Sequence, residues 1–201
     1  TWYSKGYRVP YGNASLSYRD YAARVVAHYR DDPTIIAWSM MNEADTSAHD
    51  ELARLASEAR VAGLLSGKSG VSFFHLGDGR GALAPLRALR DDTDIPLRQL
   101  YPTHCNRNPW LFAEAIEWGR AGGWVDLTTS SFPDLLDDGE RLAADALVAL
   151  LAAGVPVDRI SFSSDANASL PRFDGEGRLI ELRCGQIGIL WQEVVAATGS
   201  C

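Results

Sequence analysis

The chain of 201 residues contains little cysteine, no long hydrophobic run and no excess of positive charge. Its three cysteines are too few and too scattered for a disulfide framework, so a reducing, cytoplasmic compartment is expected. No apolar run approaches the ~20 residues of a membrane span, and the N-terminus lacks the apolar core of a signal peptide. The formal net charge of −7 disfavours nucleic-acid binding, which needs an excess of Lys and Arg. The sequence therefore predicts a protein that binds neither membranes nor nucleic acids.

An initiating methionine is also lacking, because the chain begins with Thr1, and this predicts a fragment or a processed form. Hydrophobic residues make up 46% and charged residues 22%, which is ordinary for a soluble globular protein. At this length, a single domain with its own core is expected over residues 1–201. Four tryptophans fall in segments with helix or strand patterns and are expected in that core: Trp38, Trp118, Trp124 and Trp191.

Helix-like and strand-like patterns alternate along the chain. Apolar residues at helical spacing predict helices over the ranges 18–30, 50–65, 82–90, 109–120, 138–153 and 188–197. Continuous β-prone apolar runs predict five strands, at 34–41, 71–75, 97–102, 124–129 and 159–163. Strands of this kind favour a parallel α/β sheet covered by helices, or the inside of a barrel. Because a closed (β/α)8 barrel needs eight strands and typically ~250 residues, five strands predict a partial TIM barrel.

Three of the predicted strands end in a potential metal ligand. His75 and His104 stand at the ends of the second and third strands, and Asp165 follows the fifth. Because neighbouring parallel strands present their carboxyl ends at one edge, two imidazoles and one carboxylate would converge there. Such groups are suitable zinc ligands, so these three residues are candidate metal ligands. The adjacent Cys105 would point to the opposite face of its strand and is expected to pack in the core.

Three motifs, and the helices between them, carry a resemblance to a known family. The motifs are Val-Ser-Phe-Phe-His75-Leu-Gly-Asp, Pro-Thr-His104-Cys-Asn-Arg-Asn and Ser-Ser-Asp165-Ala-Asn-Ala-Ser. Through them, residues ~48–201 resemble the isoaspartyl dipeptidases, also called β-aspartyl peptidases, of the amidohydrolase superfamily. The resemblance implies a (β/α)8 barrel with two zinc ions that hydrolyses isoaspartyl dipeptides, a small peptide substrate, through a zinc-activated hydroxide. It also implies that the strands of this chain correspond to strands four to eight of that barrel.

The same resemblance implies a role for individual residues. His75 and His104, at the ends of the fifth and sixth barrel strands, would bind one zinc ion. Asp165, at the end of the eighth strand, would bind the other zinc ion and act as the general acid/base. Arg107 would hold the α-carboxylate of the substrate, since a guanidinium fork suits a carboxylate. Ser169 would contact the substrate from the loop after the eighth strand.

The chain departs from this family in its first ligands and in one loop. The family carries a His-x-His pair on the first strand and a carboxylated lysine on the fourth. This chain contains no His-x-His, and it has Ile35-Ile-Ala-Trp-Ser-Met-Met-Asn42-Glu43 at the fourth-strand position. Ala166 and Ala168 stand where the family usually has glycines. Half of the binuclear ligand set is therefore missing, and one zinc ion, or none, is expected.

The first 45 residues resemble a different family. The segments Tyr18-Arg-Asp-Tyr, His28-Tyr-Arg-Asp-Asp-Pro and Asn42-Glu43 look like the third helix and fourth strand of clan A glycoside hydrolases, such as family 5 cellulases and mannanases. The resemblance implies that Glu43 is a general acid/base. A retaining glycosidase needs a second carboxylate ~5 Å away, and the strand at 124–129 has no Glu at its tip. The two resemblances predict a chimera, with a glycosidase-like segment at 1–47 and a dipeptidase-like segment at 48–201.

Three functional interpretations remain open on the sequence. The preferred one is a zinc metallopeptidase of the amidohydrolase type that cleaves isoaspartyl dipeptides. The first alternative is a glycoside hydrolase that uses Glu43 as its general acid/base. The second is an inactive fragment or assembly module, because an open five-stranded sheet has exposed edges through which copies could form a homo-oligomer.

Overall fold

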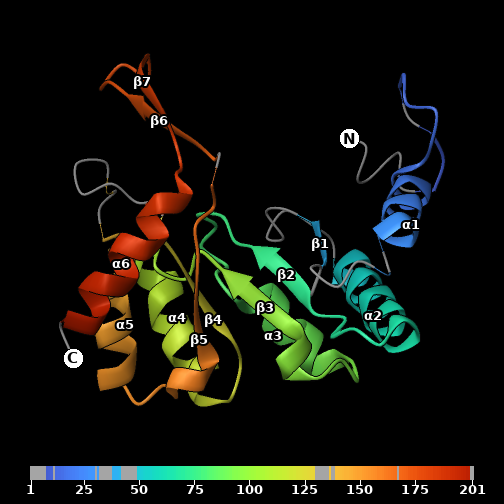
Figure 1. Cartoon of the computed structure of the whole chain (residues 1–201), viewed down its shortest axis with the longest axis horizontal. Coiled ribbons are helices and arrows are strands. Elements are labelled where there is room, and N and C mark those ends of the chain that lie inside the picture. Colours follow the sequence, from blue (N-terminus) through green and yellow to red (C-terminus); the bar gives the residue numbers. More distant parts are fainter. Residues whose placement is uncertain are drawn as a thin grey trace.

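The structure is a computed structural model that describes most of the chain. The described residues are 8–10, 12–29, 31, 38–41, 49–129, 136, 139–166 and 168–199. Their helices are α1 (Tyr18–Tyr29), α2 (His49–Ser66), α3 (Ala84–Asp92), α4 (Pro109–Arg120), α5 (Ala143–Ala152) and α6 (Ile187–Gly199), with short 3-10 turns at Leu97–Gln99 and Val157–Arg159. Their strands are β1 (Trp38–Met41), β2 (Ser72–His75), β3 (Leu100–Thr103), β4 (Val125–Thr128), β5 (Ile160–Ser163), β6 (Ser169–Phe173) and β7 (Leu179–Cys184). Figure 1 shows the predicted alternation of helix and strand from α1 to β5.

The five predicted strands are parallel and form two sheets. β1, β2 and β3 make a three-stranded sheet, and β4 pairs with β5 in a second sheet. The pairing of β2 with β3 ends with His75 opposite Thr103, and that of β4 with β5 ends with Thr128 opposite Ser163. The predicted parallel α/β arrangement is therefore confirmed, whereas the eight-stranded barrel and the division of the chain at residue 47 stay predictions.

The two parallel sheets meet where β3 lies beside β4. At this join the side-chain amide of Asn106 makes the hydrogen bonds that a neighbouring strand would make. Its Oδ1 accepts from the Thr128 N–H at 2.8 Å, and its Nδ2 donates to the Thr128 carbonyl at 3.0 Å. The Asn106 Nδ2 also donates to the Arg141 carbonyl at 2.8 Å. The Cys105 N–H donates to the Asp126 carbonyl at 3.1 Å. We call this join, made by Cys105, Asn106, Asp126 and Thr128, the β3–β4 seam.

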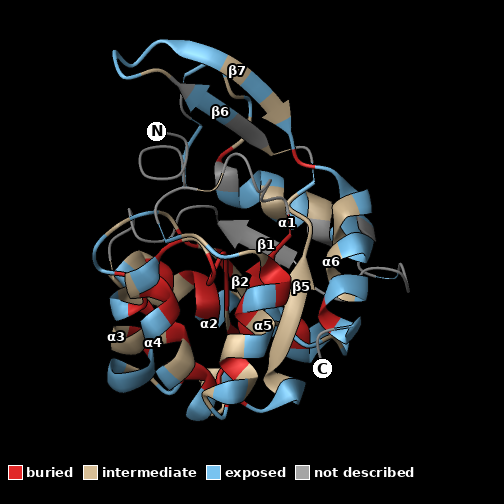
Figure 2. Ribbon diagram, turned by 90° about the vertical axis from the view of Figure 1, so that its left-hand side faces the viewer, coloured by how far each residue is buried: buried red, intermediate tan, exposed pale blue. Residues whose placement is uncertain are grey.

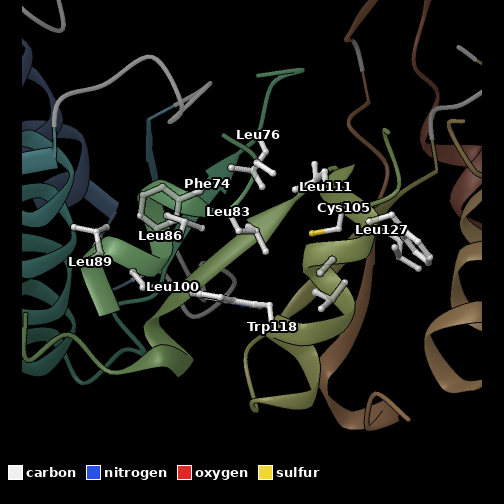
Figure 3. Packing of buried hydrophobic residues seen from close by; sticks show 14 of the residues in the cluster. Phe74, Leu76, Leu83, Leu86, Leu89, Leu100, Cys105, Leu111, Trp118 and Leu127 are labelled. Atoms are coloured by element: carbon white, nitrogen blue, oxygen red, sulfur yellow. The ribbon is translucent and has the colours of Figure 1, made fainter. Parts of the chain in front are cut away.

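The core lies between the parallel strands and helices α2 to α5, and Figure 2 shows the buried segments gathered there. Leucines dominate it, and eight of them are 0% exposed: Leu52, Leu83, Leu86, Leu89, Leu100, Leu111, Leu127 and Leu150. Figure 3 shows several of these side chains packed around β3, together with Cys105, which is buried as predicted. Burying one such leucine contributes roughly 1.5–3 kcal/mol, so the core fixes the strands relative to the helices. Of the helices in the described part of the chain, none is long and apolar enough to cross a bilayer.

The C-terminal part of the chain differs from the sequence-based prediction in two ways. Residues 169–184 form an antiparallel hairpin of β6 and β7, which was not among the five predicted strands. Figures 1 and 2 both show this hairpin standing apart from the parallel strands. On α6, Trp191 is 71% exposed, so its predicted core position is wrong, whereas Trp118 is buried. α6 packs against α5, where Glu193 accepts from the Ala144 N–H at 2.9 Å.

Asn106→Ala is expected to lower the free energy of unfolding by about 2–4 kcal/mol, because it leaves the buried N–H and carbonyl of Thr128 without partners at the β3–β4 seam. Asn13→Ala, at an exposed position, serves as the control and is expected to change it by less than about 0.5 kcal/mol. Urea unfolding followed by circular dichroism measures both values. Equal effects of the two substitutions would contradict the structural role of Asn106.

Candidate metal centre

The carboxyl ends of β2, β3 and β5 bring His75, His104 and Asp165 together, as the sequence predicts. One ligand atom from each residue lies within 4.8 Å of the other two. The distance from His75 Nδ1 to His104 Nε2 is 3.0 Å, and that from His104 Nε2 to Asp165 Oδ2 is 3.9 Å. Within the described ranges, no other group of three or more His, Cys, Asp or Glu side chains converges in this way.

Two of these residues leave their strands through an unusual backbone conformation. His104 has a φ of 64° and Asp165 a φ of 45°, both in the left-handed region that residues other than glycine seldom adopt. Histidine and aspartate tolerate this region better than most residues. Such a conformation still costs of the order of 1 kcal/mol and persists only where neighbouring contacts enforce it. At His104 such contacts come from both neighbouring residues, Thr103 and Cys105, which bond to Asp126.

Burial keeps both imidazoles neutral, which is the form that binds a metal. His104 is only 3% exposed, and this burial, aided by the charges of Arg107 and His75, lowers its pKa to about 2. Burial also lowers the pKa of His75, against the opposing effect of the Asp165 carboxylate. Both side chains can therefore offer a lone pair at neutral pH.

The orientation of His104 is set by Thr128. His104 Nδ1 lies 2.6 Å from Thr128 Oγ1, across the β3–β4 seam. This bond occupies Nδ1 and directs Nε2 toward His75 and Asp165. Histidines that bind metals commonly have their second ring nitrogen held by such a partner, which fixes the tautomer and the ring plane.

The three donors are of kinds that zinc binds. A tetrahedral zinc with ligand distances of ~2.0–2.2 Å separates neighbouring ligand atoms by ~3.4 Å. Two of the three separations, 3.0 and 3.9 Å, lie on either side of that value, and all three atoms lie within 4.8 Å of one another. Two imidazole nitrogens and one carboxylate oxygen also match a known type of catalytic zinc site, which keeps a further position open.

Asp126 lies beneath this centre and is surrounded by hydroxyl groups. Its carboxylate is 2% exposed and accepts hydrogen bonds from Thr103, Ser161 and Ser163. Tyr101 extends the network by donating to Ser161. We call these side chains the hydroxyl layer: Tyr101, Thr103, Thr128, Ser161 and Ser163, arranged around Asp126. Burial raises the pKa of Asp126 to about 6, although the three hydroxyl donors oppose the rise.

Sequence reasoning missed the hydroxyl layer, although a signal for it exists. Polar side chains recur at a spacing of two in three strands that are otherwise apolar, at positions 101 and 103, 126 and 128, and 161 and 163. A spacing of two places both members of each pair on the same face of the strand. Three parallel strands with such pairs indicate a polar layer inside the fold.

The remaining predicted site residues are placed as follows. Arg107 lies in the turn between β3 and α4, and its Nη1 donates to the Leu76 carbonyl at 2.7 Å. This contact puts the guanidinium next to the end of β2, close enough for its charge to lower the pKa of both His75 and His104. Ser169 is the first residue of β6, but its side chain lies outside the described part of the structure. Glu43 lies wholly outside the described residues.

Comparisons with known proteins reveal a structural relationship to dipeptidases. No protein-family model matches the chain. The fold is similar to that of a β-aspartyl dipeptidase from the thermophilic, keratin-degrading Fervidobacterium islandicum AW-1, whose structure was solved in complex with β-Asp-Leu dipeptide. The TM-score is 0.73 and the sequence identity 27%, over 95% of this chain and 48% of that one. A second structure of a β-aspartyl dipeptidase from this organism gives a TM-score of 0.67 and 24% identity, over 95% of this chain and 46% of that one.

These matches support the predicted resemblance to isoaspartyl dipeptidases. The second one, at 24% identity, concerns the fold alone. This chain spans about half the length of the two dipeptidase chains. The predicted resemblance of the first 45 residues to glycoside hydrolases is not shown by these matches and stays a prediction.

Asp126→Asn is expected to change how stability depends on pH. Because the pKa of Asp126 is raised from 3.8 to about 6 in the folded state, its contribution to stability is fully present below about pH 4 and is lost as the pH rises through about 6. The metal-free parent should therefore lose stability relative to Asp126→Asn across this window, by on the order of 3 kcal/mol. Urea unfolding in EDTA at several pH values measures the difference. A difference that does not vary with pH would contradict the buried titration.

Proposed function

We propose that this chain binds one zinc ion through His75, His104 and Asp165 and hydrolyses the β-aspartyl bond of a small dipeptide. The observation that carries the proposal is the convergence of their three ligand atoms within 4.8 Å at the carboxyl ends of parallel strands. The similarity of the fold to a dipeptidase solved with β-Asp-Leu supports the choice of substrate. Carboxyl ends of parallel strands are also where enzymes with barrel folds place their chemistry.

Each residue of the centre has a separate task in this proposal. Zinc, when bound, supplies a Lewis acid that lowers the pKa of water and polarises the scissile carbonyl. Asp165 is 26% exposed at the rim, so it can take a proton from the attacking water and give it to the leaving amine. His104 is buried and held by Thr128, so it serves as a rigid ligand and takes no part in proton transfer.

Arg107 binds the substrate in this proposal. Its guanidinium lies beside the end of β2, next to the two histidines, where a dipeptide would have to approach. A guanidinium offers a planar fork that pairs with both oxygens of a carboxylate. Arg107 would therefore hold the α-carboxylate of the β-aspartyl residue, and Ser169, at the start of β6, would add a hydroxyl contact.

The chain is expected to bind about one zinc ion. Loss of any one ligand should weaken zinc binding by more than ~100-fold, because removing a residue that merely hydrogen-bonds to a ligand already lowers metal affinity by ~10–100-fold. The variants are His75→Ala, His104→Ala and Asp165→Asn. His49→Ala, a histidine at the start of α2 outside the centre, is the control and should bind zinc like the parent. Equilibrium dialysis against zinc buffered by a chelator measures the affinities. A parent chain without zinc affinity would contradict the metal centre.

With zinc bound, the chain is expected to hydrolyse β-Asp-Leu. Arg107→Met should raise the KM for this substrate by ~10–100-fold, because it removes a hydrogen bond to a charged group. Arg107→Lys should restore only part of this, because an ammonium lacks the planar fork. Arg90→Met, on the exposed side of α3, is the matched control.

A second substrate separates binding of the α-carboxylate from a general loss of activity. In β-Asp-Leu with the aspartyl α-carboxylate amidated, the partner of Arg107 is absent. Arg107→Met should therefore change KM for this amide by little. An equal rise in KM for both substrates would contradict the assigned role of Arg107.

A further inference from the structure

We propose that Asp126 is a positioning residue of the metal centre, which holds the ends of β3 and β5 at the separation that lets His104 and Asp165 share an ion. This inference rests on the proposed metal centre. Asp126 itself lies on β4 and is not one of the converging ligands. It acts through Thr103, the residue before His104, and through Ser163, which lies two residues before Asp165.

The first argument is that Asp126 holds the chain on both sides of His104. Its Oδ2 accepts from the Thr103 hydroxyl, one residue before His104. Its backbone carbonyl accepts from the Cys105 N–H at 3.1 Å, one residue after His104. His104 is thus the middle residue of a segment fastened at both ends to the same residue of β4. This explains how its φ of 64° is maintained.

The second argument is that the same carboxylate holds the strand that leads to Asp165. The Ser161 hydroxyl donates to Asp126 Oδ1 at 2.6 Å, and the Ser163 hydroxyl donates to Oδ2. Ser163 precedes Asp165 by two residues, and its carbonyl accepts from the Thr129 N–H at 2.9 Å. β5 is therefore tied to β4 at its last residue, just before Asp165 turns with a φ of 45°.

The third argument is that Asp126 Oδ2 bridges two sheets that share no ladder in the described structure. His75 and His104 come from the sheet β1–β2–β3, whereas Asp165 follows the sheet β4–β5. Thr103 belongs to the first sheet and Ser163 to the second, and their hydroxyls lie 3.2 Å apart on the same carboxylate oxygen. A change in this bridge would alter the distance between the ligands of the two sheets.

A carboxylate suits this task better than an apolar side chain would. Apolar packing is stabilising but has no preferred direction, whereas a carboxylate oxygen accepts hydrogen bonds at defined distances and angles. Burying a carboxylate is unfavourable unless its oxygens are satisfied, and here three hydroxyls satisfy them. The buried carboxylate therefore lowers the stability of the fold somewhat, but its hydrogen bonds fix the spacing of the strand ends.

The test compares Asp126→Leu with Gln99→Leu, a second buried polar residue that lies at the opposite end of β3. Gln99 donates to the carbonyls of Ala56 and Gly70, far from the ligands along the strand, so its loss also destabilises the fold. Both variants should melt at a lower temperature than the parent. Only Asp126→Leu should weaken zinc binding, by ~10–100-fold. When cobalt(II) is bound in place of zinc, its visible absorption reports the ligand geometry, and only Asp126→Leu should change that spectrum. Asp126→Asn, which keeps the shape and one acceptor oxygen, should recover part of the affinity.

A readout without metal separates this inference from the proposed function. The side-chain ¹⁵N resonances of His104 in the metal-free chain should move in Asp126→Leu and stay in place in Gln99→Leu. If Asp126→Leu does not fold, Thr103→Val and Ser163→Ala each remove one donor and should give smaller shifts. Unchanged His104 resonances together with parental zinc affinity in the folded Asp126 variants would overturn the inference. A parent that binds no zinc would overturn the proposed function, and the ¹⁵N resonances would then decide the positioning role alone.

Discussion

The candidate centre depends on the β3–β4 seam, where two parallel sheets are joined mainly by side chains. Regular ladders hold β1 to β3 together and β4 to β5 together, but the candidate ligands are divided between these two sheets. Backbone pairing alone therefore cannot determine the distance from His104 to Asp165. Asn106 continues the hydrogen bonding of the sheet across the seam, and Asp126 ties the strand ends to each other. Thr128 completes the seam by holding the His104 ring.

The electrostatics of the site follow from where water is excluded. The seam lies deep enough that Asp126 has a raised pKa, whereas the same exclusion lowers the pKa of His104. Both shifts favour the neutral form of the buried group, and burial is the main cause in each case. A neutral imidazole is the form that binds a metal, so burial leaves His104 in that form. His75 and Asp165 are both less buried than His104.

The sequence predicts the parts of this structure that depend on pattern, and misses those that depend on side-chain geometry. Continuous apolar runs predict all five parallel strands, and the residues at the strand ends predict the convergence of His75, His104 and Asp165, because the carboxyl ends of these strands lie on the same side of the fold. The hairpin β6–β7 was missed because Pro171 and the polar turn after it are untypical of a buried strand. The outward position of Trp191 depends on which face α6 presents to α5, which its composition does not reveal.

The left-handed turn at His104 could not be predicted either, because hydrogen bonds from the residues on either side of it to Asp126 hold it in place. In the proposed function this turn matters for the donor set, because it directs the His104 ring toward His75 and Asp165. A catalytic zinc commonly has three protein ligands and one open position. The two imidazoles and one carboxylate that lie within 4.8 Å of one another would supply that number of ligands. The proposed site therefore depends on a backbone conformation that the β3–β4 seam enforces.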